Sequence, residues 1–197
     1  MQKEISNGVE EKIPEKTEEK NHNFRQSAWE FIKFFLIAVL IVVPIRIWVA
    51  QPFIVSGSSM LPNFENGEYL IVDEFSYHFR APVRGEVIIF RAPRNTSEFY
   101  IKRIIGLPEE KVEISDGAIT IFNNEFPEGM ELSEAYIKNI SRDRDLSLTL
   151  KPNEYFVLGD NRPMSSDSRV WGPLEENLII GRAWLRLWPF NKVSILF

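Results

Sequence analysis

The chain has 197 residues, 44% of them hydrophobic and 26% charged, with 15 Phe and 5 Trp, which is typical of one folded domain with appendages and excludes a wholly disordered protein. Its net charge of −5 argues against nucleic acid as the main partner, because no basic excess is present to neutralise phosphates. The lack of cysteine excludes a thiol nucleophile, disulfides and Cys-bound zinc, and with only His22 and His78 we expect neither a metal nor a cofactor.

A polar leader precedes one long apolar stretch. Residues 1–27 interleave Glu and Lys with almost no apolar side chains, so we expect this leader to be disordered. The following stretch is densest at 34–45, and with its flanks it reaches about 20 residues, enough for a transmembrane helix over residues 28–50. Lys33 and Arg46 lie near its ends, where long basic side chains can reach the interface. A buried core helix is the alternative, whereas a cleaved signal peptide is disfavoured because no A-x-A site with a polar exit follows.

Basic residues near the apolar stretch predict its orientation. On its C-terminal side, Arg46 is the only basic residue until Arg80. The N-terminal side carries Lys12, Lys16, Lys20, Arg25 and Lys33. By the positive-inside rule the leader stays in the cytoplasm and residues 51–197 lie on the extracytoplasmic side. The sequence therefore predicts a single-pass protein of the plasma membrane, with the lipid bilayer as one partner.

From Gln51 onward the pattern changes to short β-type runs separated by turn residues. Asp116-Gly117 joins two of these runs directly, which is a strong hairpin signal. The sequence predicts a mainly β fold: an antiparallel core sheet of residues 51–108 and 153–197, with a small inserted β subdomain at 109–152. The predicted runs are 69–75, 86–90, 99–107, 111–115, 118–122, 154–160 and 178–190.

Three polar clusters stand out in this β region. The first is Ser56-Gly57-Ser58-Ser59-Met60-Leu61-Pro62, where a glycine beside serines lets the backbone turn tightly and expose a hydroxyl. Serine–glycine loops are usually only loops, so this cluster alone does not single out a nucleophile. The third cluster is the dense loop at 159–172, whose aspartates and arginines can form an ion-pair network. It lacks the spacing and the closing Glu of an EF-hand, so no calcium site is predicted.

The second cluster, Tyr100-Ile101-Lys102-Arg103-Ile104-Ile105-Gly106, places a lysine on an apparent strand among apolar residues. Successive side chains of a strand point to opposite faces, so either Lys102 or Arg103 points inward; the alternative is an edge strand with both exposed. Lowering a lysine pKa from about 10.4 to about 7 requires roughly 4–5 kcal/mol, which apolar burial can supply. Such a neutral lysine is a competent general base for a serine hydroxyl, whereas a Ser-His-Asp triad would rest on His78 alone.

Taken together and in this order, the clusters resemble the type I signal peptidases of bacteria, a family of Ser/Lys proteases. The resemblance covers residues 28–108 and 155–190, with the leader and the insertion matching loosely. It implies the β fold that signal peptidases share with the self-cleaving SOS repressors. The matching motifs are SGSSMLP (56–62), RGEVIIF (84–90), YIKRIIGLP (100–108) and GDNRPMSSDSRVWG (159–172).

The resemblance also implies the roles of single residues. The serine before the motif's Met is the nucleophile, hence Ser59, and the lysine of the YIKR strand is its general base, hence Lys102. Ser165 matches a serine that hydrogen-bonds the lysine amine. Gly57 stands where some members have an oxyanion-donating serine, so the Ser59 N–H would be the main oxyanion donor. Asp160, Asp167 and Arg169 match family positions whose side chains keep the active-site residues in place. Asn161 and Arg162 belong to the same motif, in less defined roles.

The implied substrates are signal peptides of secretory preproteins, cut after small residues at −1 and −3 by a monomeric enzyme. An extended peptide alternates its side chains, so these two residues enter the same face. Asn63, where Thr is common, is expected to make a local side-chain-to-backbone hydrogen bond. Phe75 and Trp188 can rest on lipid, although core packing is the expected role of each. The expected walls of the substrate pocket are Phe53, Val55, Met60, Phe64, Tyr100 and Ile101.

Other functions predict other features. A self-cleaving SOS repressor would carry an N-terminal DNA-binding domain where this chain has its leader and apolar stretch. A membrane-tethered, non-catalytic β module that binds exported proteins would give Lys102 an ordinary pKa. The His-using relatives of the secretory pathway are set aside because Lys102 holds the position of the base.

Overall fold

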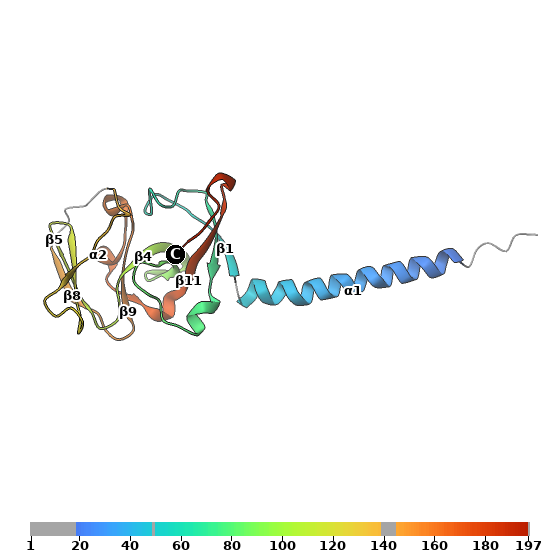
Figure 1. Ribbon diagram of the computed structural model, residues 1–197, viewed down its shortest axis with the longest axis horizontal. Helices are drawn as coiled ribbons and strands as arrows, with labels where there is room; N and C mark the ends of the chain where they lie inside the picture. The colour runs from blue at the N-terminus through green and yellow to red at the C-terminus, as the bar shows by residue number, and fades with distance from the viewer. Residues whose placement is uncertain (1–18, 49, 139–144, 197) are drawn as a thin grey trace, which may run out of the picture. The chain divides into compact units, whose positions relative to one another are not determined.

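The first element of the structure is one long helix. In the computed structural model, which describes residues 19–48, 50–138 and 145–196, α1 spans Glu19–Trp48 (Figure 1). Its segment Gln26–Val43 is long and apolar enough to cross a membrane, and none of that segment is buried, as a lipid-facing helix requires and a core helix does not. Residues 19–27 are thus helical rather than disordered: the helix of the apolar stretch continues through them, and Glu19, Lys20, Arg25 and Gln26 are good helix formers. The rest of the predicted leader, with Lys12 and Lys16, lies outside the described residues.

The β region begins with an antiparallel sheet, in which strands far apart in the sequence become neighbours. The strand order is β1-β2-β11-β3-β4-β9-β10, and β12 pairs with β11. Residues 51–54, at the end of the apolar stretch, lie in the edge strand β1. The strands are β1 (Ala50–Ile54), β2 (Tyr69–Asp73), β3 (Val87–Ala92), β4 (Asn95–Gly106), β9 (Glu154–Leu158), β10 (Leu174–Glu175), β11 (Ile179–Trp188) and β12 (Ser194–Ile195).

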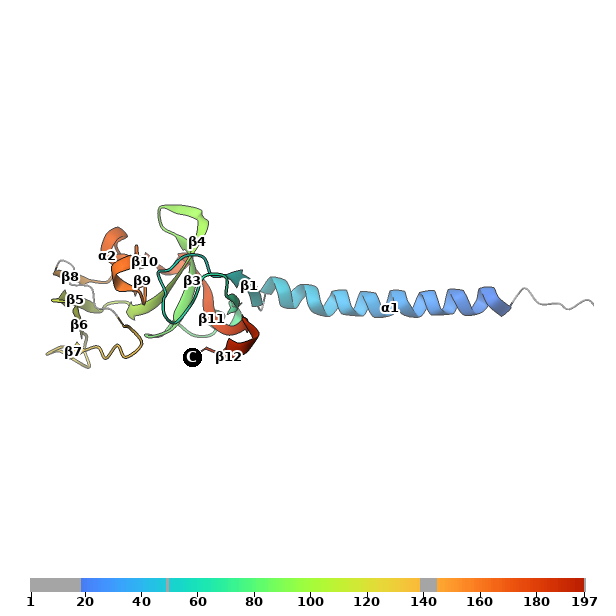
Figure 2. The same ribbon diagram turned by 90° about the horizontal axis from the view of Figure 1, so that it is seen from above.

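A second antiparallel sheet is built from the chain between β4 and β9. Its order is β7-β6-β5-β8, and Figure 2 shows these strands together at one end of the β region, away from β11 and β12. The predicted hairpin is confirmed: Ser115 pairs with Ala118, and Asp116 and Gly117 both have positive φ, as a type I′ turn requires. The strands are β5 (Lys111–Ser115), β6 (Ala118–Phe122), β7 (Met130–Glu131) and β8 (Leu146–Thr149).

Apolar residues form three buried clusters around these sheets. One packs between β2, β3 and the loop after β1 and includes Met60 and Phe64. Another joins the second sheet to β4 and β9 through residues such as Ile121 and Phe156. Phe75 and Trp188 belong to none of the three: both are largely exposed and stack on Phe79 and Phe190, respectively, so the expectation of core packing was wrong.

Short helical turns connect the strands. α2 spans Ser168–Trp171, and its N-cap is Asp167, whose side chain accepts a hydrogen bond from the Arg169 N–H. Three-ten helices cover Phe75–His78, Arg162–Met164, Glu176–Leu178 and Phe190–Lys192. The third polar cluster thus folds as two short helical turns after β9, close to the turn that follows β1, because the Asn161 N–H donates to the Ser59 carbonyl.

Candidate active site

The turn after β1 exposes the candidate nucleophile. Gly57 has a φ of +96°, a conformation that residues with a Cβ rarely adopt, and its N–H donates to Asn66 Oδ1 at 3.0 Å. The Gly57 N–H is therefore already engaged and is not free to serve as an oxyanion donor. The turn is tied to the loop after β9 because Asn161 donates its backbone N–H to the Ser59 carbonyl at 2.9 Å and its Nδ2 to the Ser58 carbonyl at 3.0 Å.

Lys102 on β4 reaches this turn. Its Nζ lies 2.7 Å from Ser59 Oγ and 2.8 Å from the Ile101 carbonyl, and the residue is only 4% exposed. Burial lowers the pKa of Lys102 to about 8, although the negative charges of Asp167 and Asp160 act in the opposite direction. The amine is thus within reach of the Ser59 proton and loses its own proton far more readily than an exposed lysine does.

Arg103 projects to the opposite face of β4, as strand alternation requires. It donates to both carboxylate oxygens of Asp160, at 2.9 Å from Nε and 2.7 Å from Nη2, and to the Gly85 carbonyl at 2.8 Å. Of the two alternatives left open by the sequence, the one with opposed side chains is therefore confirmed: Lys102 faces Ser59 and Arg103 binds the loop after β9.

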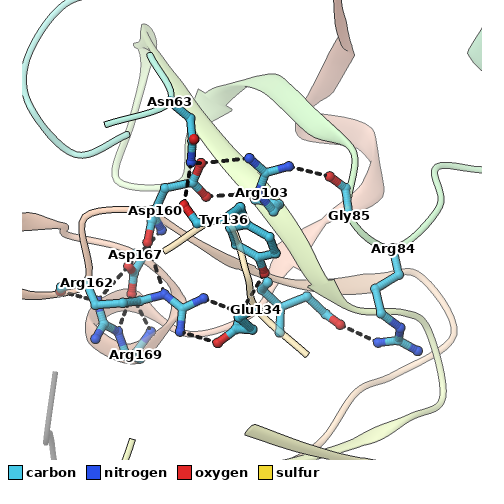
Figure 3. A network of polar contacts seen from close by, with 12 residues as sticks. Asn63, Arg84, Gly85, Arg103, Glu134, Tyr136, Asp160, Arg162, Asp167 and Arg169 are labelled. Carbon is cyan, nitrogen blue, oxygen red and sulfur yellow. Dashed lines mark hydrogen bonds and ion pairs between the residues drawn. The ribbon is translucent and has the colours of Figure 1, made fainter. Parts of the chain in front are cut away.

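The charged residues of that loop form the network drawn in Figure 3. Asp167 is fully buried, accepts the Gly159 N–H at 3.1 Å, and is held by two hydrogen bonds of 2.8 Å from Arg169. Arg169 also donates to the Arg162 carbonyl at 2.7 Å. These contacts fix the backbone on both sides of Ser165. The geometric role implied for Asp160, Asp167 and Arg169 stays a prediction.

Ser165 lies against the nucleophile turn, and Gly159 separates the two. A Cβ on Gly159 would meet Ser165 Oγ at 2.2 Å and the Ser59 carbonyl oxygen at 2.5 Å, so only glycine fits there. The Ser165 hydroxyl is buried and has no hydrogen-bond partner within the described chain. Its predicted bond to the Lys102 amine stays a prediction.

Ser59 and Lys102 line one cavity of about 310 Å³. Phe53, Val55, Tyr100 and Ile101 line it as well. Met60 and Phe64 are not among its lining residues: both are buried in the cluster beneath Val55, where they support the wall instead of forming it. The sequence reasoning missed Ile54, Phe99, Met164 and Ser166, which also line the cavity and each directly neighbour a predicted site residue. It also missed Leu70 and Ile89, which the fold brings to the cavity from β2 and β3 and for which the sequence offers no signal.

The sheet curls to form this cavity. Phe53 on β1 and Phe99 on β4 pack edge to face with ring centroids 5.4 Å apart, although β2, β11 and β3 lie between the two strands in the sheet order. Among the described residues, no group of three or more His, Asp or Glu side chains is arranged to hold a metal ion. The groups that the cavity presents for chemistry include the Ser59 hydroxyl beside the buried Lys102 amine.

Comparison with known proteins identifies the family. The model of the family "Signal peptidase, peptidase S26" matches residues 28–188. The probable signal peptidase I-1 of Synechocystis sp. is 34% identical over 177 residues, which cover 84% of this chain and 87% of the relative. The signal peptidase I of Leptolyngbya laminosa is 36% identical, with 85% and 83% covered. A crystal structure of a signal peptidase I from Enterococcus faecalis aligns at 34% identity with a TM-score of 0.44, covering 52% of this chain and 97% of that one. The chain therefore belongs to the signal peptidase family S26.

Proposed function

We propose that this peptidase removes signal peptides from exported preproteins, with Ser59 as nucleophile and Lys102 as general base, and cuts after small residues at −1 and −3. The observation that carries the proposal is the 2.7 Å separation of Lys102 Nζ and Ser59 Oγ inside the cavity. The family and its relatives, which are named signal peptidases, support the reaction, and the lowered pKa of Lys102 supports the role of base.

The proposed reaction is acyl transfer in two steps. Neutral Lys102 takes the Ser59 proton while Oγ attacks the scissile carbonyl carbon, and the resulting ammonium gives that proton to the leaving amine as the peptide bond breaks. Neutral Lys102 then takes a proton from water, whose oxygen attacks the ester carbon, and returns it to Ser59 Oγ as the ester bond breaks. The Ser59 N–H is the proposed oxyanion donor. Because Lys102 must be neutral, kcat/KM should rise as the pH passes through about 8.

Unpaired strand edges support binding of an extended substrate. β1 is an edge strand, and in the described structure residues 99–101 of β4 pair with β3 only. A peptide lying between them can hydrogen-bond to either strand and direct alternate side chains at the cavity. The cavity walls Phe53, Val55, Tyr100 and Ile101 are apolar, which supports uncharged side chains such as Ala at the two positions that enter it.

The membrane arrangement belongs to the same proposal. α1 would anchor a single-pass, monomeric enzyme with its N-terminus in the cytoplasm and its catalytic core (51–108 and 153–197) on the extracytoplasmic side, because basic residues are concentrated before the span. The strands of the second sheet all fall within residues 109–152, which supports treating that segment as an inserted subdomain. Accessibility of single cysteines placed at residues 20 and 128 to an impermeant thiol reagent tests the orientation.

Cleavage by the purified full chain in detergent or lipid tests the chemistry. The substrate is a preprotein with Ala at −1 and −3, and the variants are Ser59→Ala, Lys102→Ala and Lys102→His. We expect both alanine variants to lose activity by at least about 10³-fold, because nucleophile and base act as a unit. Ser115→Ala, at an exposed serine of β5 that does not line the cavity, is the matched control and should remain active. Full activity of Ser59→Ala or Lys102→Ala would refute the mechanism, and a substrate with Phe at −1 should not be cut.

A further inference from the structure

Residues 132–138, which follow β7, connect the second sheet to the loop after β9 (residues 159–172). We call this loop the catalytic loop and residues 132–138 the bracing segment. Its start is fixed to β6 because the Leu132 N–H donates to the Ile119 carbonyl at 2.8 Å. A turn then follows, in which the Ile137 N–H donates to the Glu134 carbonyl at 3.1 Å. Figure 3 shows that the side chains of Glu134 and Tyr136 point into the network around Asp160 and Asp167.

Glu134 forms a buried ion pair with Arg162. Arg162 Nη1 donates to Glu134 Oε2 at 2.8 Å and Nη2 donates to Oε1, with side chains only 4% and 8% exposed, respectively. Tyr136 Oη donates to the same carboxylate at 2.6 Å. Arg162 Nε in turn donates to the Gly159 carbonyl at 3.1 Å. Since a buried charge without its partner is strongly unfavourable, loss of Glu134 would displace Arg162 and the backbone of Gly159.

Tyr136 reaches the other half of the network. Its ring lies under the Arg103 guanidinium, 4.2 Å from ring centroid to Cζ, and its carbonyl accepts a hydrogen bond from Asn63 Nδ2 at 2.8 Å. Asn63 Nδ2 also lies 2.8 Å from Asp160 Oδ2. The bond expected for Asn63 is therefore made to a backbone carbonyl, but to one far away in the sequence. The bracing segment thus contacts Arg103 directly and is linked to Asp160 through Asn63.

These contacts end at the residues that surround the candidate base. The Lys102 amine faces Ser59 Oγ and the ring of Tyr100, and the charges that act on it are those of Asp167 and Asp160. The loop held by the bracing segment also supplies Ser166 and Met164 to the cavity wall. Lys102 is only 4% exposed and shares its cavity with Met164 and Ser166 of this loop. Exclusion of water is what makes the amine a base near neutral pH.

We propose that Glu134 and Tyr136 are positioning residues for the Ser59–Lys102 dyad: the bracing segment of the insertion holds the catalytic loop closed over Lys102. The inference rests on the proposed function. The inserted sheet then contributes to the reaction indirectly, because β6 and β7 anchor the segment that carries Glu134 and Tyr136. Neither side chain lines the cavity, so their loss should lower kcat through the dyad, and KM should change only as far as Met164 and Ser166 move with the loop.

The test compares Glu134→Gln with the control Glu131→Gln. The control removes an exposed carboxylate on β7, directly before the bracing segment. With the full-length enzyme and a preprotein substrate, Glu134→Gln should lose about tenfold or more in kcat, as small displacements of reacting groups do. The lower-pH limb of its kcat/KM profile should move upward by about half a pH unit or more, because a looser loop hydrates Lys102 and raises its pKa. Glu131→Gln should match the wild type in both measurements.

Tyr136 supplies the second arm. Tyr136→Leu removes the ring under Arg103 and should reproduce the shifted profile, whereas Tyr136→Phe keeps the ring, should fold, and should show a smaller shift. The inference would be overturned if the pH midpoint of kcat/KM were unchanged in Glu134→Gln and in both Tyr136 variants, and if their lower kcat were explained by a smaller fraction of folded, active enzyme. Glu134 and Tyr136 would then only support folding. Failure of the proposed function is recognised separately, because then Ser59→Ala would cleave as well as the wild type.

Discussion

The contact of Gly159 with both halves of the site makes Gly159→Ala the most direct structural test. The added Cβ would meet the Ser59 carbonyl oxygen at 2.5 Å and Ser165 Oγ at 2.2 Å, whereas real Cβ contacts essentially never fall below 3.0 Å. The Ser165 hydroxyl can rotate away, but Ser165 Cβ, at 2.6 Å, cannot, so the backbone at Ser165 also has to move. The Ser59 carbonyl cannot rotate away either, because it is held by the Asn161 N–H at 2.9 Å, so the turn that carries the nucleophile has to shift by about 0.5 Å or more.

Such a shift should affect activity more than stability. A displacement of about 1 Å can reduce catalysis about 10²-fold, so we expect kcat/KM of Gly159→Ala to fall by about 10- to 100-fold. Overpacking of this kind destabilises a domain by about 1–3 kcal/mol, which leaves most molecules folded. The measurements are kcat/KM on a preprotein substrate and the urea midpoint of unfolding.

Gly67→Ala is the control. Gly67 has a φ of +87° and no atom within 4 Å of an added Cβ, so alanine there strains the backbone by about 1–3 kcal/mol without touching the dyad. This variant should lose stability and keep its kcat/KM at temperatures where it is folded. Wild-type kcat/KM in Gly159→Ala, or equal losses of activity in the two variants, would refute the reasoning.

Two further predictions concern Lys102 and Ser165. Burial lowers the Lys102 pKa from 10.5 to about 8. Between these two pH values the unfolded chain binds more protons than the folded chain, so the free energy of unfolding of the wild type should rise with pH. Relative to Lys102→Met, which cannot titrate at this position, the rise should reach up to about 3 kcal/mol. Denaturant titrations of both proteins from pH 7.5 to 10.5 measure this difference. If the free energies of unfolding of wild type and Lys102→Met changed in parallel with pH, the lowered pKa of Lys102 would be contradicted. Ser165→Ala removes a buried hydroxyl without a partner in the described chain, so the free energy of unfolding should change by less than about 1 kcal/mol. If Ser165 orients the Lys102 amine, kcat should nonetheless fall.

Local signals account for what the sequence predicted correctly. The Asp116-Gly117 turn, the β-type runs and the apolar stretch each depend on a few neighbouring residues, and the structure contains all three. Boundaries were less certain: α1 begins at Glu19, within the predicted leader, because helical propensity continues past the point where apolar character ends.

Side-chain surroundings could not be read in the same way. The family resemblance implied that Met60 and Phe64 are pocket walls, but the fold buries them in one cluster with Val55. Asn63 was expected to bond locally, yet its partners are Tyr136 and Asp160. In both cases the outcome depends on which strands become neighbours, and strand neighbours are not encoded by nearby residues.

The sequence by itself determined the residue types and their order: an apolar segment, a serine turn, a lysine on a strand and a charged loop, which together indicate the family. Only the tertiary structure decided that Lys102 Nζ lies beside Ser59 Oγ and that the insertion reaches the catalytic loop through Glu134 and Tyr136. The physical reason is that burial, and with it the pKa of Lys102, is produced by contacts between segments dozens of residues apart.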